Sequence, residues 1–281
     1  MRLEYFTKNL EFPFFLHFGK HDESVGMHYH QDFSELVIVL EGSATHKVDN
    51  DVFQISKGDV FVINQGTSHG YENPVNFKIC NIMYDFDYMF SDASDIKESS
   101  GFHALFVVEP YFRNQEFRSR TRLSDDSLES VKLVLKQMLD EYRQKHVGYI
   151  SLLKAEFMKL AIDFSRKYDV YETVQDLNVF GLACVAASME KNYGKVFSVS
   201  YMAELAGMSV RHFTRMFTVT YGIPPTKYLE NIRMNKAKLL LRSSSKTVTE
   251  IAYECGFSDN NYFTRRFKAL FQVTPSGFRS I

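Results

Sequence analysis

The chain has 281 residues, of which 45% are hydrophobic, and a formal net charge of −1. This length exceeds one ordinary domain, so we expect two, and the composition is that of a globular rather than a disordered protein. No apolar run reaches the ~18 residues that a membrane helix needs. The first ten residues lack the apolar region of a signal peptide, which predicts a cytoplasmic protein.

The charge distribution and the cysteine content give further information on the function and the cellular compartment. Residues 179–281 carry 14 Lys and Arg against 6 Asp and Glu, a net charge of +8, whereas residues 1–178 carry −9. A basic C-terminal third suits a DNA-binding unit attached to a part that does not bind DNA. The three cysteines, Cys80, Cys184 and Cys255, form no C-x-x-C pair, which indicates a reducing compartment.

Residues 12–90 predict a small β-barrel. The region contains strand-length runs rich in β-branched and aromatic residues, among them ELVIVLEG, GDVFVIN and FKICNIMYDF. Residues 49–51, Asp-Asn-Asp, are typical of a hairpin turn. Several short strands at a spacing of about ten residues favour an all-β sandwich or barrel.

Histidines and a glutamate on these strands form a candidate site. His28-x-His30 is followed by Glu35, and a second segment carries His69. His28 and His30 alternate along one strand, so both side chains point the same way. Three histidines and one carboxylate can bind a divalent metal. The same side chains can instead hydrogen-bond a small molecule or one another.

The two segments resemble the two motifs of the cupin family. The first continues from Glu35 to Gly42, and the second runs from Gly58 through Asn64, Gly66 and His69 to Asn73. Asp22 and Asn64 stand where the family pattern has a glycine and a proline. A cupin barrel fused to a regulator domain implies a sugar or another small molecule in the cavity more often than a working metal. We therefore expect no required cofactor, and a divalent metal at these residues stays an open alternative.

Residues 96–168 predict a connection and a helical hairpin. Residues 96–122 show weak patterning, which favours loops with one strand. A helix capped by Ser124 or Asp125 runs to about Lys145, and a second runs from Ile150 to Tyr168. The apolar stripes of these helices cover the barrel or each other, or they face a second chain. The expected domains are a sensing barrel over 1–122, a hairpin and candidate dimerisation element over 123–168, a linker over 169–178 and a DNA-binding domain over 179–281.

The C-terminal domain contains an internal repeat. The segment MAELAGMSVRHFTRMFTVTYGIPPTKYL at 202–229 matches IAYECGFSDNNYFTRRFKALFQVTPSGFR at 251–279, with one extra residue in the second copy. Gly207 and Gly256 each end a short helix. Ser209 and Ser258 are expected to cap the next helix, and Thr247 with Glu250 forms a capping box. Two copies are too few for a solenoid, so the repeat predicts two helix-turn-helix units.

Polar residues lie off the buried stripe of each second helix. Arg pairs with guanine and Asn with adenine in the major groove, and Lys suits phosphate contacts. The candidate DNA-binding residues are Arg211, Thr214, Arg215, Asn260, Asn261, Thr264, Arg265, Lys246 and Lys268. Arg and Asn on one exposed helix face are often only solvated, but two copies in register favour DNA binding. A helix over residues 225–242, about 25 Å long, would hold the two units about one DNA turn, ~34 Å, apart.

Residues 179–281 are similar to the DNA-binding domain of the AraC/XylS family, most clearly over AYECGFSDNNYFTRRFKALFQVTPSGFR. With the cupin-like front end, the resemblance covers nearly the whole chain. It implies a bacterial transcription regulator, often an activator that contacts RNA polymerase. By position, the base-contacting residues of the family fall on Arg211, Thr214, Arg215, Asn260, Asn261 and Arg265. Arg211 stands where relatives often carry another residue type, so the target sequence is not transferable.

Together these observations predict an α+β protein of two domains that regulates transcription and is not an enzyme. Its expected partners are double-stranded DNA, a small-molecule effector, expected to be a sugar, RNA polymerase and a second copy of the chain, with no membrane. The ligand-binding residues are expected to be His28, His30, Glu35 and His69. One alternative is a metal-dependent cupin enzyme fused to a DNA-binding domain. Another is a constitutive regulator with an empty barrel.

Overall fold

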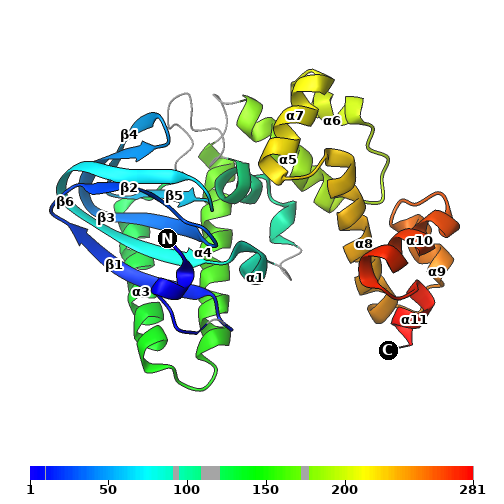
Figure 1. The fold of residues 1–281 in the computed structure, drawn as a ribbon, viewed down its shortest axis with the longest axis horizontal. Helices are drawn as coiled ribbons and strands as arrows, with labels where there is room; N and C mark the ends of the chain where they lie inside the picture. The colour runs from blue at the N-terminus through cyan, green and yellow to red at the C-terminus, as the bar shows by residue number, and fades with distance from the viewer. Residues whose placement is uncertain (10, 91–94, 109–120, 172–176, 281) are drawn as a thin grey trace. The chain divides into compact units, whose positions relative to one another are not determined.

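The computed structural model describes residues 1–9, 11–90, 95–108, 121–171 and 177–280. The chain divides into two compact units, Met1–Gln175 and Asp176–Ile281, which we call unit 1 and unit 2. Unit 1 combines a sheet with helices, and unit 2 is helical (Figure 1). This confirms the predicted α+β class with two domains. Among the described residues, no helix is long and apolar enough to cross a membrane.

The sheet of unit 1 is antiparallel, with the order β1-β6-β3-β5-β7, and β2 and β4 pair with β6 and β3. The strands are β1 (Phe14–His21), β2 (Val25–Tyr29), β3 (Ser34–Val48), β4 (Asp51–Ser56), β5 (Asp59–Ile63), β6 (Ser68–Tyr84) and β7 (Thr121–Arg122). The predicted turn is confirmed, because Asp49 adopts a left-handed conformation with φ of 51° between β3 and β4.

The long strands β3 and β6 bend around the core. Their pairing shifts register between Val39 and Thr45, and such irregularities bend the bulged strand. Gly42 lies in this stretch with φ of +71°, and a Cβ there would lie 2.1 Å from the carbonyl oxygen of Val75. The core cluster takes residues from both halves of each strand: Val37, Val39, Ala44, Ile55, Phe61, Ile63, Tyr71, Phe77 and Ile79. The halves therefore enclose one interior, which we call the barrel.

The helical part of unit 1 differs from its prediction over 96–108. This stretch is helical, with a 3₁₀ turn (Ile96–Glu98), α2 (Ser100–Phe102) and a π-helical turn (His103–Val108), and α1 (Phe86–Phe90) precedes it. Phe90, Phe102 and Phe106 pack with ring centroids 4.9–5.4 Å apart. This aromatic contact stabilises helical turns that the sequence pattern did not indicate. The short β7 is a strand within the region, and residues 109–120 lie outside those described.

The predicted hairpin is present as α3 (Asp125–Gln144) and α4 (Tyr149–Tyr171). Ser124 caps α3, as expected, and α4 continues past the predicted end at Tyr168. Phe157 of α4 contacts Phe14 and Tyr84 of the sheet, so the apolar stripe of α4 covers the barrel. The linker predicted over 169–178 falls partly in α4 and partly in the next helix, and residues 172–176 lie outside the described part of the chain.

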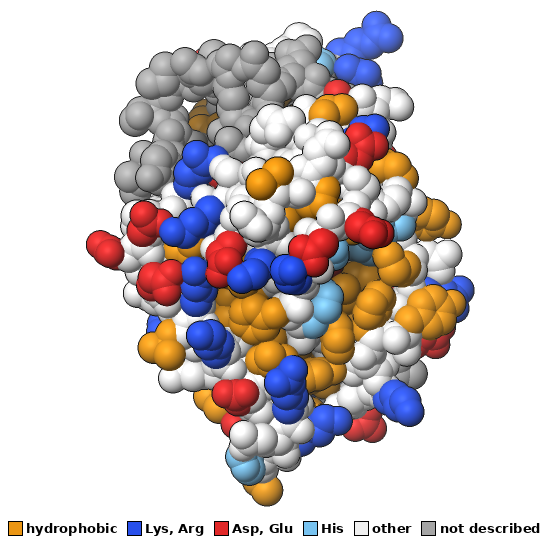
Figure 2. Space-filling model, turned by 90° about the vertical axis from the view of Figure 1, so that its left-hand side faces the viewer, with side chains coloured by type: hydrophobic (Ala, Val, Ile, Leu, Met, Phe, Trp, Pro, Cys, Tyr) orange, Lys and Arg blue, Asp and Glu red, His pale blue; other side chains and the backbone are white. Residues whose placement is uncertain are grey.

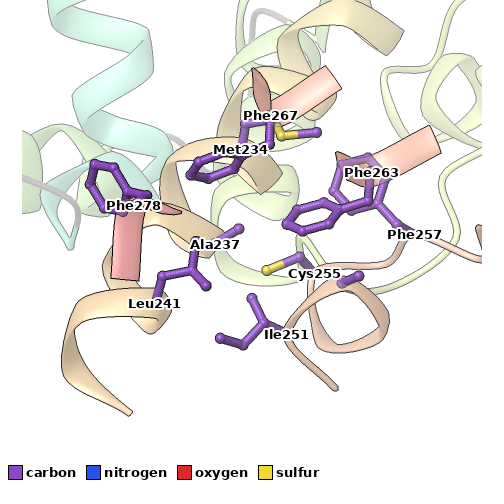
Figure 3. Close-up of a cluster of buried hydrophobic side chains, with 10 residues drawn as sticks. Met234, Ala237, Leu241, Ile251, Cys255, Phe257, Phe263, Phe267 and Phe278 are labelled. Carbon is purple, nitrogen blue, oxygen red and sulfur yellow. The ribbon is translucent and has the colours of Figure 1, made fainter. Parts of the chain in front are cut away.

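Unit 2 contains the two predicted helix-turn-helix units. Its helices are α5 (Leu177–Lys191), α6 (Val199–Leu205), α7 (Val210–Tyr221), α8 (Pro225–Ser243), α9 (Val248–Glu254), α10 (Asn260–Phe271) and α11 (Pro275–Arg279). Helices α6 and α7 form the first unit, α9 and α10 the second, and α8 joins them. Figure 3 shows the buried cluster in which α8, α9, α10 and α11 meet, including Met234, Cys255, Phe263 and Phe267.

Candidate functional site

The barrel brings together the four residues that were predicted to bind a ligand. Ligand atoms of His28, His30 and His69 all lie within 4.8 Å of one another. The Oε2 atom of Glu35 lies 4.0 Å from Nε2 of His30 and 3.8 Å from Nε2 of His69. His28 lies near the end of β2 opposite His69 of β6, His30 follows the last residue of β2, and Glu35 lies at the start of β3. We call these four residues the barrel site.

Burial keeps Glu35 and His30 of the barrel site mainly uncharged near neutral pH. Burial raises the pKa of the Glu35 carboxyl to about 8, although a hydrogen bond with Asn81 acts in the opposite direction. Burial, together with the charges of His28 and the chain N-terminus, lowers the pKa of His30 to about 3. At pH 7 Glu35 is therefore mainly a neutral acid that can donate a hydrogen bond, and His30 is a neutral imidazole.

The structure adds side chains to the site that sequence reasoning missed. The ring of His46 is buried, with its centroid 5.7 Å from that of His69 and 4.9 Å from that of Tyr71. Asn81 hydrogen-bonds Glu35, and its Oδ1 is buried with no hydrogen-bond partner among the described residues. For Asn81 the available signal was a polar residue within an apolar strand, whereas His46 stands between Thr45 and Lys47 and gave no such signal. Figure 2 shows hydrophobic and histidine side chains gathered in a hollow bordered by charged side chains.

The first helix-turn-helix unit follows its prediction closely. Ser209 caps α7 and accepts a hydrogen bond from the His212 N–H. Phe213 and Phe217 are buried, whereas Arg211 and Arg215 are exposed. Two further side chains of α7, Thr214 and Met216, are intermediate in burial. The hydroxyl of Thr214 donates to the carbonyl of Val210 at 2.8 Å.

The second unit corrects one cap. Thr247 and Glu250 form the predicted capping box of α9. Asp259 rather than Ser258 caps α10, because its carboxylate accepts from the Asn261 and Tyr262 N–H groups at 2.7 and 3.1 Å. The extra residue of the second copy lies here, and it moves the helix start to Asn260. The cap therefore falls one residue later than the aligned copies indicate.

The polar residues of α10 differ in exposure. Asn261 and Arg265 are exposed, while Asn260 and Thr264 are half-buried, although all four were expected on the surface. The Oδ1 atom of Asn260 is buried and has no hydrogen-bond partner within the described ranges. Asn260 therefore presents less of its amide to a groove than its neighbour. We call α7 and α10, the second helices of the two units, the recognition helices. The DNA contacts assigned to their side chains stay predictions.

Two predicted phosphate-binding lysines lie around the second unit. Lys246 is exposed and forms an ion pair of 2.6 Å with Glu254. Lys268 is exposed on the last turn of α10. The neighbouring Arg266 forms an ion pair with Glu230 of α8. Burial raises the pKa of Glu230, but hydrogen bonds from Arg266 and Lys227 outweigh it and hold this pKa below its usual range.

Two family models match this chain. A family model described as a helix-turn-helix domain matches residues 202–281, and one described as a cupin domain matches residues 14–82. The chain is 27% identical over 251 residues to the HTH-type transcriptional activator RhaS of Enterobacter sp. (strain 638), covering 89% of this chain and 86% of that protein.

Solved structures match the C-terminal part. A transcriptional regulator with an AraC-type DNA-binding domain from Chromobacterium violaceum is 32% identical, over 36% of this chain and 89% of that one, with a TM-score of 0.34. The DNA-binding domain of AdpA, solved in complex with a target DNA, is 32% identical over 36% of this chain and 90% of that one, with a TM-score of 0.34. From the two matching domains and the similarity to RhaS over 89% of the chain, the chain belongs to the family of AraC-type transcriptional regulators.

Proposed function

We propose that this chain is a transcription activator whose DNA binding is controlled by a carbohydrate held at the barrel site. The observation that carries the proposal is the convergence of His28, His30, Glu35 and His69 inside a barrel with a largely apolar core. A sugar presents hydroxyl groups and apolar C–H faces, and polar side chains set among apolar ones complement both. Because Glu35 and His30 are mainly uncharged near pH 7, the site favours a neutral ligand over an ion.

The DNA-binding part of the proposal assigns roles to α7 and α10. Each recognition helix enters a major groove, where Arg211, Arg215, Asn261 and Arg265 contact base edges. Half-buried Thr214, Asn260 and Thr264 support these contacts, and Lys246 and Lys268 bind phosphates. We further propose that the chain acts in the cytoplasm as a homodimer and contacts RNA polymerase, in keeping with the activator that it resembles.

A thermal-shift screen tests the effector class. The purified chain is heated with each member of a panel of aldopentoses, aldohexoses and 6-deoxyhexoses. A sugar at 100 times its dissociation constant adds about 2.7 kcal/mol to the free energy of unfolding. We expect one stereochemical class to raise the melting temperature of the wild type but not of Glu35→Gln. A panel that leaves the wild type unchanged contradicts the carbohydrate assignment.

The geometry of the barrel site also supports a second candidate, a metal-dependent cupin enzyme. Nε2 of His30 and Nε2 of His69 lie 3.3 Å apart, close to the separation of about 3.3 Å between ligands in a tetrahedral zinc site. Nδ1 of His28 lies 2.9 Å from the carbonyl oxygen of Gly26, a contact that leaves Nε2 for a metal. His28, His30, Glu35 and His69 would hold a divalent cation, which would act as a Lewis acid.

Metal analysis separates the two candidates. Stoichiometric iron, manganese, nickel or zinc in the purified wild type, lost in His69→Ala, favours the enzyme. We expect substoichiometric metal and a sugar-dependent thermal shift that survives treatment with a chelator.

A further inference from the structure

Glu230 connects the linker helix α8 to the second recognition helix α10. Arg266 donates from Nε to Oε1 of Glu230, and from its terminal nitrogen to Oε2 at 3.2 Å. The hydroxyl of Tyr262 donates to Oε1 at 3.2 Å, and Nζ of Lys227 donates to Oε2 at 3.0 Å. The side chain of Glu230 is only 15% exposed, so one partly buried carboxylate binds two side chains of α10.

The first recognition helix contacts the same part of α8. The ring of Tyr228 lies 5.4 Å from Phe217 and 5.0 Å from Tyr221 of α7, measured between centroids. Tyr228 and Glu230 are two residues apart, which places them about 200° apart around a helix. A single turn of α8 therefore contacts α7 on one side and α10 on the other.

The helix-turn-helix fold does not itself require the Glu230 contacts. In the first copy, the position of Arg266 is occupied by Met216 and the position of Tyr262 by His212. α7 packs on α8 through aromatic rings instead. The charged contact is thus a feature of the second unit alone, and its two hydrogen bonds from one guanidinium to one carboxylate make it directional.

The contact also determines which face of α10 is left free. Tyr262 and Arg266 are four residues apart and lie on one face of the helix, directed at α8. Asn261 and Arg265 each precede one of them, so they lie about 100° away around the axis and are exposed. Rotating α10 about its axis would break the contacts to Glu230 and turn Asn261 and Arg265 at the same time.

We propose that Glu230 is a positioning residue that fixes the orientation of α10 on α8, and so sets the spacing between the two DNA half-sites that α7 and α10 read together. This inference rests on the proposed entry of both helices into DNA. It assigns no DNA contact to Glu230 itself. Arg266 acts in it as a structural partner of Glu230 rather than as a phosphate ligand.

The test measures spacing preference with the full chain. A random DNA library is first selected with the wild type to obtain a bound site and its two half-sites. Affinity is then measured for this site and for versions with one base pair added or removed between the half-sites. We expect Glu230→Gln to lower affinity for the selected site about tenfold, and to bind the three spacings with nearly equal affinity. Its affinity for the isolated half-site of α7 should match that of the wild type.

Two further variants make the test specific. Glu204→Gln removes the same charge from an exposed position on α6, and we expect it to keep the wild-type spacing preference. The double variant Glu230→Arg with Arg266→Glu reverses the ion pair, and we expect it to recover part of that preference. Urea unfolding of every variant shows whether unit 2 remains folded.

Two results would overturn the inference. One is a folded Glu230→Gln variant that discriminates between spacings as the wild type does. The other is tighter binding with a salt dependence steeper by about one phosphate contact, because Arg266 released from Glu230 would then bind DNA backbone. A selection that enriches no site contradicts the proposed function, and the inference with it.

Discussion

Glu35 makes the barrel site sensitive to pH in the metal-free protein. Its pKa is about 8 in the folded chain, mainly because of burial, against an ordinary value of 4.5. Between these values folding takes up a proton, so the free energy of unfolding falls as the pH rises. The buried His30, with a pKa lowered to about 3 from 6.5, has the opposite effect below pH 6.5. The contribution of Glu35 is therefore measured most clearly between pH 6.5 and 8.

We expect Glu35→Gln to reduce this loss of stability. Glutamine cannot ionise, so its variant should lose less free energy of unfolding than the wild type as the pH rises from 6.5 to 8. Urea unfolding at several pH values in the presence of a chelator measures both slopes. Equal slopes in the two proteins would show that Glu35 does not keep its proton in the folded state.

The arginines of the recognition helices should carry specific binding. Arg215 and Arg265 occupy matched positions, 50 residues apart, and both are exposed. If each side chain reads a base, its change to alanine costs ~1–3 kcal/mol of specific binding. Fluorescence anisotropy with the selected site and with unrelated DNA measures specific and non-specific affinity. Unchanged affinity for the selected site in both variants would refute the assignment.

At the scale of single residues, the sequence predicted the four residues of the barrel site better than the residues around them. His28, His30 and Glu35 are close in the chain, and alternation along one strand was enough to align the histidines. His46 and Asn81 reach the site through strand pairing, His46 beside Tyr71 and Asn81 beside Val37. The register of paired strands cannot be read from a local sequence pattern. The cap of α10 was misplaced for a related reason, because aligned copies do not show where an inserted residue lies.

At the scale of elements, the turn glycines of the two repeats differ in their surroundings. Gly207 and Gly256 have φ values of +66° and +79°, so alanine strains either turn. A Cβ on Gly207 would meet nothing within 4 Å. A Cβ on Gly256 would lie 2.8 Å from the guanidinium of Arg233 and 2.9 Å from the carbonyl oxygen of Gly194. Arg233 is held there by hydrogen bonds of 2.8 Å to the carbonyls of Tyr193 and Lys195.

Gly256→Ala should therefore be the more damaging of two matched substitutions. We expect Gly207→Ala to cost about 1 kcal/mol of unfolding free energy, from backbone strain alone. Gly256→Ala should cost at least about 2 kcal/mol, because it adds a steric clash that displaces Arg233. Urea unfolding of the full chain, followed by circular dichroism, compares the variants. An equal cost would mean that Arg233 moves aside freely.

Elements with local start and stop signals were predictable, and elements stabilised by distant contacts were not. Ser124 and Thr247 begin their helices as expected, because a cap acts on the N–H groups of its own helix. The helical turns within 96–108 depend on the packing of Phe90, Phe102 and Phe106. That packing follows from the tertiary fold rather than from periodicity.

At the scale of the whole molecule, the proposed function requires that a ligand in unit 1 changes DNA binding by unit 2. The repeat and the charge asymmetry were enough to predict two functional parts from the sequence. The coupling between them can be no larger than the difference in ligand affinity between two states of the chain. A typical coupling of ~1–3 kcal/mol changes DNA affinity by about 5- to 150-fold, and DNA changes sugar affinity by the same factor.

The most direct test measures the dissociation constant for the selected DNA site with and without the sugar that gives the largest thermal shift. We expect saturating sugar to change this constant at least about fivefold in the wild type, and to leave it unchanged in Glu35→Gln. A sugar that binds the wild type at the barrel site, yet leaves its affinity for DNA the same, would contradict the proposed control of DNA binding.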